Sequence, residues 1–158
     1  MHATIGAAQI LIKDDEVLLV KLNYGKAKGG WILPGGMVEH EETPQSGAER
    51  EVFEETGVRS KTISPVAVRF RKSEFGMPNL YWVFSGQLPD ESLVTLKRML
   101  RWPAGELMEA AFIPVEDALK TEEVRPMTRL FLSLEQRRSD LKQMTWMNDD
   151  KDCIFRFV

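Results

Sequence analysis

The feature that most constrains the fold is the segment 43–57, which has the start and stop signals of a helix and an acidic end. Thr43 is a residue type that caps helices, Pro44 suits the first helical position, and Gly57 stands where helices are terminated. At about 100° per residue, three glutamates fall within one arc about 100° wide. They are Glu51, Glu54 and Glu55. The segment therefore predicts a helix with three carboxylates on one face.

The position of these carboxylates is unfavourable unless another group offsets their charge. They repel one another, and they lie at a helix C-terminus, where the dipole favours cations, so each costs roughly a few tenths of a kcal/mol or more. A bound divalent cation would offset that cost, because ions such as magnesium take oxygen ligands and combine one or two carboxylates with substrate phosphates. The alternative is a solvated acidic face, which is the commoner outcome for a charge run.

The spacing of the residues around the helix favours the cation. Between residues 36 and 58 the chain has a glycine, five residues, a glutamate, seven residues and then Arg-Glu-Val-x-Glu-Glu-x-Gly-Val. This pattern resembles the Nudix box at all nine specified positions in a window of 23 residues. The preceding segment, 31–36, also resembles the usual lead-in of that family. By this resemblance the chain is identified as a member of the Nudix hydrolase superfamily.

The resemblance implies a fold, an activity and a cofactor. The fold is α/β, a Nudix-type α/β/α sandwich with a mixed central sheet. The activity is metal-dependent hydrolysis of a phosphoanhydride bond in a small nucleoside diphosphate-linked substrate, such as a nucleotide sugar or a nucleoside triphosphate. The cofactor is Mg²⁺ or Mn²⁺, and the family adds the backbone carbonyl of Gly36 to the three candidate ligands Glu51, Glu54 and Glu55.

The remaining candidate catalytic residues follow from the chemistry of the bond. Cleavage requires neutralised phosphoryl charge and an activated water. Arg50 is expected to orient or balance the glutamates, because its planar fork holds carboxylates bidentately, and Glu42 to tie its loop to Arg50. The general base stays open, since family members take it from the box or from a later loop. The candidates are Glu54, Glu55, Glu106 and Glu109, and the last two are equally compatible with surface positions.

The length of 158 residues, 43% of them apolar, suits one hydrophobic core. We expect a single Nudix domain over residues 1–141, followed by a C-terminal tail, 142–158, that forms a strand or a subunit contact. The expected strands are 4–12, paired as a hairpin with 17–22, then 61–71, 80–88 and 110–114, with a short helix over 115–119. An apolar helical stripe predicts core or subunit contact, which leaves a homodimer open. Its members are Met127, Leu130, Phe131 and Leu134.

Charge and cysteine content bound the partners and the compartment. A net charge of −3 gives no general attraction to nucleic acid or anionic membranes, although it is compatible with a local basic groove. Cys153 is the only cysteine, which excludes an intrachain disulfide and favours a cytoplasmic location. No apolar run approaches the roughly 20 residues of a membrane span. His2 and His40 lack the neighbours of a zinc site or a triad, so both are expected at the surface.

The substrate is the least constrained part of the prediction. Lys21, Lys26 and Lys28 lie in or beside a Gly- and Lys-rich loop, either as phosphate contacts or as ordinary surface lysines. Aromatic side chains that stack on a base or simply pack are Tyr24, Phe75, Tyr81 and Trp102. The proline that marks many ADP-ribose pyrophosphatases is expected near residue 74, where this chain has Glu74, so that subclass is not assigned.

Three alternative functions remain beside hydrolysis of a small nucleotide. The first is hydrolysis of RNA 5′ ends, which the acidic composition disfavours. The second is a non-catalytic nucleotide sensor, which the intact glutamates of the box do not support. The third is isoprenoid diphosphate isomerisation, which employs a cysteine in related chains, and Cys153 lies too near the end of the chain to match it.

Overall fold

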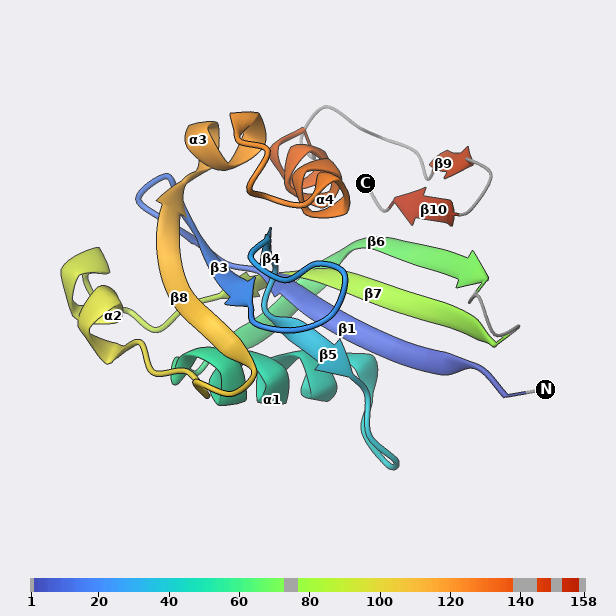
Figure 1. The fold of residues 1–158 in the computed structure, drawn as a ribbon, viewed down its shortest axis with the longest axis horizontal. Helices are drawn as coiled ribbons and strands as arrows, with labels where there is room; N and C mark the ends of the chain where they lie inside the picture. The colour runs from blue at the N-terminus through green and yellow to red at the C-terminus, as the bar shows by residue number, and fades with distance from the viewer. Residues whose placement is uncertain (1, 73–76, 138–144, 149–151, 157–158) are drawn as a thin grey trace.

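The computed structural model describes residues 2–72, 77–137, 145–148 and 152–156 (Figure 1). The larger of its two sheets has six strands in the order β5-β1-β7-β6-β10-β9. Their bounds are Gly35–Met37 for β5, Thr4–Ile10 for β1, Pro78–Gln87 for β7, Lys61–Lys72 for β6, Asp152–Arg156 for β10 and Thr145–Asn148 for β9. Strands β1 and β7 pair in parallel and the other neighbours are antiparallel. The sheet is therefore mixed, as predicted.

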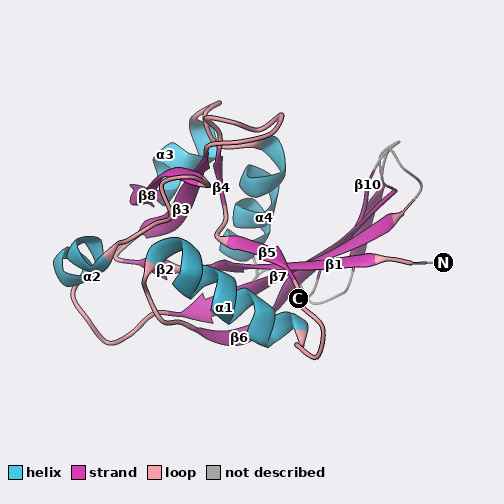
Figure 2. Cartoon of the chain, turned by 60° about the horizontal axis from the view of Figure 1, so that its bottom comes forward, coloured by secondary structure: helices cyan, strands magenta, loops and turns pink. Residues whose placement is uncertain are grey.

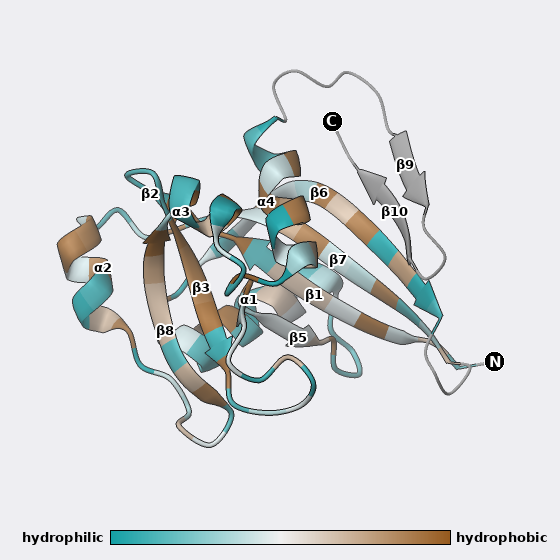
Figure 3. Ribbon diagram, turned by 45° about the horizontal axis from the view of Figure 1, so that its top comes forward, coloured by the Kyte–Doolittle hydropathy of each residue, from teal (hydrophilic) through white to brown (hydrophobic). Residues whose placement is uncertain are grey.

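The smaller sheet has four strands, with β3 at its centre. Their bounds are Ile12–Lys13 for β2, Glu16–Leu22 for β3, Trp31–Ile32 for β4 and Leu107–Pro114 for β8. Figure 3 shows hydrophobic residues concentrated along β3 and β8. Residues 17–20 of β3 are completely buried. This sheet supplies a large share of the apolar core, and β8 begins three residues before the predicted strand.

The described helices are α1 (Pro44–Thr56), α2 (Leu93–Met99), α3 (Val115–Lys120) and α4 (Pro126–Gln136). Helix α1 lies on one side of the larger sheet, whereas α3 and α4 lie on the other side (Figure 2). The α/β/α arrangement is thus confirmed. Helix α2 was not predicted, although Ser92 caps its N-terminus and Leu96 is fully buried. In the helices of the described chain, no segment combines the length and apolar character needed to cross a membrane.

The prediction of one strand over 4–12 is wrong, because the chain changes sheet within it. Strand β1 ends at Ile10 in the larger sheet and β2 begins at Ile12 in the smaller one. The predicted hairpin is real, but it joins β2 to β3. Its turn is formed by Asp14 and Asp15, with φ of 48° and 62°, a conformation that aspartate tolerates. Since Leu11 between the strands is itself buried, hydrophobicity alone does not reveal the change of sheet.

The apolar stripe of α4 packs inside the chain. Phe131 and Leu134 are buried in the largest core cluster, and Met127 and Leu130 pack against it. The core prediction is therefore confirmed. Within the tail, β10 pairs with β6 and β9 pairs with β10, so these residues extend the chain's own sheet. The division of the chain at residue 141 stays a prediction.

Candidate active site

Helix α1 has the predicted caps. The Thr43 hydroxyl accepts a hydrogen bond from the backbone N–H of Ser46 at 3.2 Å, and the Ser46 hydroxyl accepts one from the N–H of Thr43 at 3.0 Å. At the other end Gly57 has φ of 74° and its N–H donates to the carbonyl of Phe53. The buried side of the helix carries small and apolar residues. This leaves its glutamates beside the loop and strand that precede the helix.

Arg50 binds three glutamates on or beside one face of α1. We call this face, with Glu51, Glu54 and Glu55, the acidic face. Arg50 Nε donates to Glu42 Oε1 at 2.8 Å, and one terminal nitrogen donates to Glu42 Oε2 at 3.1 Å and to the carbonyl of Met37 at 2.9 Å. The other terminal nitrogen donates to Glu51 Oε1 at 3.0 Å and to Glu54 Oε2 at 2.9 Å. These five bonds match the five N–H donors of a guanidinium group. Arg50 therefore binds the loop before the helix, through Met37 and Glu42, and two glutamates of the helix at the same time. We call residues 37–42 the box loop.

The predicted contact between Glu42 and Arg50 is confirmed. The hydrogen bond from Arg50, followed by that from the Glu39 N–H, holds the pKa of Glu42 below its ordinary value. The hydrogen bond with Glu42 is also the main reason why the pKa of Arg50 is raised above its ordinary value. Glu39 and Glu41 are exposed. Glu42 therefore serves to hold Arg50, and through Arg50 it orders the glutamates of the helix.

For Glu51 and Glu55 of the helix, burial makes the charged form unfavourable, and their hydrogen bonds only partly offset this cost. Burial raises the pKa of Glu51, against the opposing effect of the hydrogen bond and charge of Arg50. Burial also raises the pKa of Glu55 to about 8, and the charges of Glu51, Glu106 and Glu54 act in the same direction. The opposing contact of Glu55 is the backbone N–H of Gly35, which donates to its Oε2 at 3.1 Å. Two carboxylates whose ionisation is disfavoured by burial thus lie at this end of α1.

Gly36 lies directly against the carboxylate of Glu51. A Cβ built on Gly36 would stand 2.5 Å from both Cδ and Oε1 of Glu51, so a side chain there would displace the carboxylate. Gly47 lies close to the loop that precedes the helix. A Cβ at Gly47 would meet Glu42 Oε2 at 3.2 Å and Val38 Cγ2 at 3.3 Å, and both belong to the box loop. Its small size therefore suits close packing of that loop on the helix.

The structure separates the two loop candidates for the general base. Glu106 is exposed, and its charge acts on both Glu55 and Tyr24. Burial raises the pKa of Tyr24, and the charges of Glu55, Glu106 and Glu51 raise it further. Glu109 is also exposed, and it pairs with Lys21 in the register of β8 and β3. The charge of Glu106 thus reaches Glu55 and Tyr24, whereas Glu109 lies opposite Lys21 in the smaller sheet.

Carboxylates and a backbone carbonyl are the right donors for a hard divalent cation. Within the described ranges, however, no three His, Cys, Asp or Glu side chains gather closely enough to hold a metal ion as they stand. The reason is visible in the contacts of Arg50, which draws Glu51 and Glu54 to itself. The residues therefore fit a cation in kind and charge, and a cation would compete with Arg50 for these two carboxylates.

The lysines, aromatic residues and histidines considered in the sequence analysis do not form one common site among the described residues. The ammonium group of Lys21 lies 5.4 Å from the ring centroid of Trp31, while Lys26 and Lys28 are exposed in the loop. Trp102 is exposed, at 39%, and lines none of the three described pockets. Phe75 and Glu74 lie outside the described residues. His2 and His40 are exposed, as predicted.

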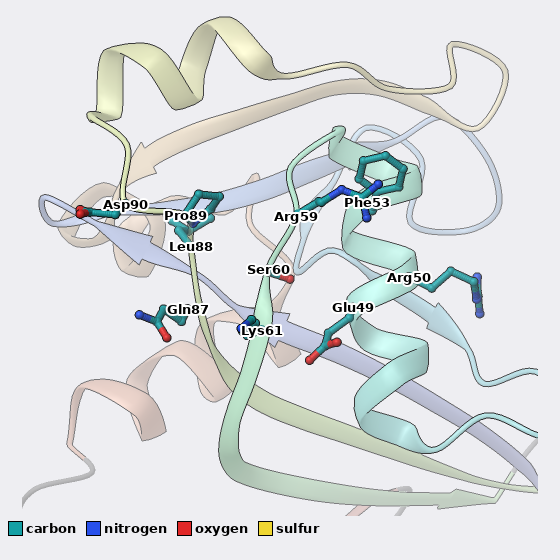
Figure 4. Close-up of a pocket in the computed structure, with 10 residues that line it drawn as sticks. All are labelled: Glu49, Arg50, Phe53, Arg59, Ser60, Lys61, Gln87, Leu88, Pro89 and Asp90. Carbon is teal, nitrogen blue, oxygen red and sulfur yellow. The ribbon is translucent and has the colours of Figure 1, made fainter.

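One pocket of about 710 Å³ lies beside α1 (Figure 4). Its lining includes only Arg50 of the predicted site residues. In Figure 4 the guanidinium group of Arg50 points away from the other labelled side chains. Phe53 lines the same pocket and stacks on Arg59, whose guanidinium carbon lies 4.4 Å from the ring centroid. This pocket is therefore separate from the acidic face.

A second pocket, of about 460 Å³, lies between α4 and the larger sheet. We call it the arginine pocket. Its charged lining residues are Arg69, Arg71 and Arg125. Its other described lining residues are Ala27, Ile32, Leu33, Tyr81, Pro126, Met127, Thr128 and Phe131. Sequence reasoning missed these arginines, although Arg69 and Arg71 are two apart in a predicted strand and so share one face of it.

Comparison with known proteins shows the family of this chain. The family model of the NUDIX domain matches residues 2–133. The chain belongs to the Nudix family. One curated relative is human "Nucleoside diphosphate-linked moiety X motif 6", 28% identical over 80% of this chain and 39% of the relative. Another is "ADP-ribose pyrophosphatase" of Methanocaldococcus jannaschii, 38% identical over 43% of this chain and 40% of the relative. This Nudix chain thus matches about two fifths of each relative's length.

A solved structure supports the fold assignment. The MutT NUDIX hydrolase from Burkholderia pseudomallei has a TM-score of 0.69 with this chain and 19% sequence identity. The match covers 85% of this Nudix chain and 98% of that protein. At this level of identity the similarity concerns the fold.

Proposed function

We propose that this Nudix chain is a pyrophosphohydrolase that cleaves a phosphoanhydride bond in a small nucleoside diphosphate-linked substrate. The observation that carries the proposal is the group of carboxylates at the end of α1, two of which are partly buried. Burial raises the pKa of both Glu51 and Glu55, although Arg50 donates a hydrogen bond to Glu51. Carboxylates kept at such a cost are typical of a functional site.

The proposed cation is Mg²⁺ or Mn²⁺, held by the Gly36 carbonyl and by Glu51, Glu54 and Glu55. When bound, such a cation neutralises phosphoryl charge and makes a water molecule more acidic. The chain's own residues prepare the site. Arg50 holds two of the glutamates in place, and the Gly35 N–H fixes Glu55. Proximity and electrostatic positioning then supply most of the catalysis, as is usual for phosphoryl transfer.

For the general base we propose Glu106 ahead of Glu109, because the charge of Glu106 acts on Glu55 and Tyr24. Its carboxylate would take the proton of the attacking water. Glu106→Gln is expected to lower kcat by about tenfold or more, within the usual contribution of general-base catalysis. Glu109→Gln is the matched control, since Glu109 is also an exposed glutamate of the same segment. Equal rates for both variants would assign the proton to a glutamate of α1.

The substrate panel should include ADP-ribose, nucleotide sugars, dinucleoside polyphosphates, nucleoside triphosphates, and capped or triphosphorylated RNA. One relative is named an ADP-ribose pyrophosphatase, but the match covers only 43% of this chain. Cleavage confined to the RNA substrates would favour the alternative activity on RNA 5′ ends. Binding of a nucleotide without its consumption would favour the sensor. A cytoplasmic location and a homodimer stay predictions.

The decisive test of hydrolysis is to replace a proposed ligand. Glu54→Gln and Glu55→Gln are expected to lower kcat by about 100-fold or more, because each removes a proposed ligand of the cation, whose positive charge would stabilise the transition state. Circular dichroism should show that both variants keep the fold. Rates near those of the unmodified chain in magnesium would refute the assignment of these residues.

A further inference from the structure

Tyr24 lies in the loop between β3 and β4 and exposes its ring to solvent. Among the aromatic side chains whose burial the structure describes, it is the most exposed, at 60%, ahead of Phe53 at 42%. We propose that Tyr24 stacks on the nucleobase of the substrate and selects compounds that carry a base over base-free diphosphates. This role in substrate choice rests on the hydrolase function proposed above.

The loop that carries Tyr24 is held in a defined conformation. At its base the N–H of Leu22 donates to the carbonyl of Gly30 at 3.1 Å, and the N–H of Gly29 donates to the carbonyl of Leu22 at 2.8 Å. Gly25 and Gly29 have φ of 68° and 80°, a conformation that glycine adopts without strain. The ring of Tyr24 is therefore presented by an ordered loop, which lowers the entropic cost of binding a base.

Hydrogen bonds connect this loop to the end of α1 through the segment before β8. The N–H of Asn23 donates to the carbonyl of Glu106 at 3.0 Å. The N–H of Arg101 donates to the carbonyl of Thr56, the last residue of α1, at 2.9 Å. The residue before Tyr24 is thus joined to the segment that carries Glu106, and the same segment is joined to the helix of the acidic face.

The charges of the acidic face act on the side chain of Tyr24. After burial, the charges of Glu55, Glu106 and Glu51 raise the pKa of its hydroxyl group. Because Coulomb interactions weaken with distance, these effects support a position of the phenol near the proposed ligands of the cation. The hydroxyl stays neutral at physiological pH, so the ring does not repel the phosphates of a substrate as a carboxylate would.

A nucleobase is the part of the proposed substrate that suits this ring. When the diphosphate lies at the glutamates of α1, the base follows after a single ribose. An exposed tyrosine offers a flat apolar face, and every base can stack on such a face whatever its hydrogen-bonding edge. The alternatives are that the Tyr24 hydroxyl binds a phosphate, or that Tyr24 is an ordinary surface residue.

Two pairs of compounds test the proposal. They are ATP and ADP-ribose, each paired with its abasic analogue, in which hydrogen replaces the adenine. We expect KM to be about tenfold lower for the adenine member of a pair, as base–aromatic stacking predicts. Tyr24→Ala should raise KM for the adenine compounds about tenfold and leave their kcat unchanged, because stacking on a base stabilises the substrate and the transition state alike. KM for the abasic analogues should stay the same.

Two variants control this experiment. Tyr24→Phe keeps the ring and loses the hydroxyl, so it should retain the preference for adenine compounds. Phe53→Ala removes another exposed aromatic side chain, one that lines the pocket separate from the acidic face, and should leave KM unchanged. If Tyr24→Phe loses the preference as Tyr24→Ala does, the hydroxyl binds the substrate and stacking is refuted. A preference that survives in Tyr24→Ala would make Tyr24 an ordinary surface residue and would refute it too.

Binding measurements separate this proposal from the hydrolase function. Dissociation constants are measured with magnesium in the Glu55→Gln background, where little substrate is consumed and both members of a pair lose the same carboxylate. We expect the adenine compound to bind about tenfold more tightly, and Tyr24→Ala to remove that difference. If this preference is found and the unmodified chain cleaves no compound of the panel above, the hydrolase function fails and the stacking role stands. If compounds are cleaved without the preference, or if neither adenine compound binds, the stacking role is refuted.

Discussion

The acidic face of α1 and the arginine pocket have opposite charge, and the chain builds them in different ways. The acidic face comes from one short stretch of sequence, and one arginine within it holds the glutamates. The pocket combines residues from the loop before β4, from β6 and β7, and from the start of α4. Local spacing therefore encodes the first region, whereas only the fold assembles the second. The family is defined by its box, so we expect its members to share the chemistry of the acidic face and to differ in the pocket.

Among substitutions in the two regions, we expect Arg50→Ala to cause the largest loss of stability. The substitution removes five hydrogen bonds and leaves the charges of Glu42, Glu51 and Glu54 facing one another. The side chains of Arg50, Glu42 and Glu51 are 22%, 19% and 16% exposed, so their pairing lies between the buried and the surface case. We expect the free energy of unfolding to fall by about 2 to 3 kcal/mol, measured by urea denaturation without metal.

Two variants control the Arg50 experiment. Arg50→Lys keeps the charge but cannot reproduce the five-donor fork, so it should restore only part of the lost stability. Arg98→Ala removes an exposed arginine from α2 and should change stability by less than about 0.5 kcal/mol. If Arg50→Ala were as harmless as Arg98→Ala, the acidic face would be held together by something other than Arg50.

The pH dependence of stability tests the acidic face alone. Burial raises the pKa of Glu55 from 4.5 to about 8, so the folded chain keeps a proton that the unfolded chain releases. This contribution is complete below pH 4.5 and is lost as the pH rises to about 8. The metal-free chain should therefore lose stability over this range with a slope of at most about 1.4 kcal/mol per pH unit, measured by urea denaturation at a series of pH values.

Glu55→Gln is the control for the pH experiment, because glutamine has no proton to lose in this range. Its stability curve should be flatter than that of the unmodified chain between pH 5 and 8. The remaining slope is assigned to Glu51, whose pKa is also raised by burial. Parallel curves for the two proteins would show that Glu55 titrates at its ordinary value. The arginine pocket holds no carboxylate in its described lining, so Arg125→Gln should leave the slope unchanged.

The sequence predicts most of the acidic face and little of the pocket, for physical reasons. The helix caps at Thr43 and Gly57 act within a few residues, so they can be read directly and were confirmed. The link from Glu42 to Arg50 spans eight residues and was expected from the box. Arg125 meets the sheet through contacts with residues about ninety positions earlier, and no local pattern reports such a distance. The change of sheet at Leu11 was missed for the same reason.

The smallest change in stability is expected from Gly6→Ala, which acts on Tyr81, a lining residue of the arginine pocket. Gly6 is opposite Tyr81 in the register of β1 and β7, and a Cβ at Gly6 would stand 2.5 Å from Cδ2 of the ring. Gly6→Ala must therefore move the ring and should cost about 1 to 1.5 kcal/mol, as overpacking usually does. A double-mutant cycle with Tyr81→Ala isolates this contact, because Gly6→Ala should become nearly neutral once the ring is gone. An unchanged cost in that background would place the strain in β1 itself and not in the contact between Gly6 and the ring of Tyr81.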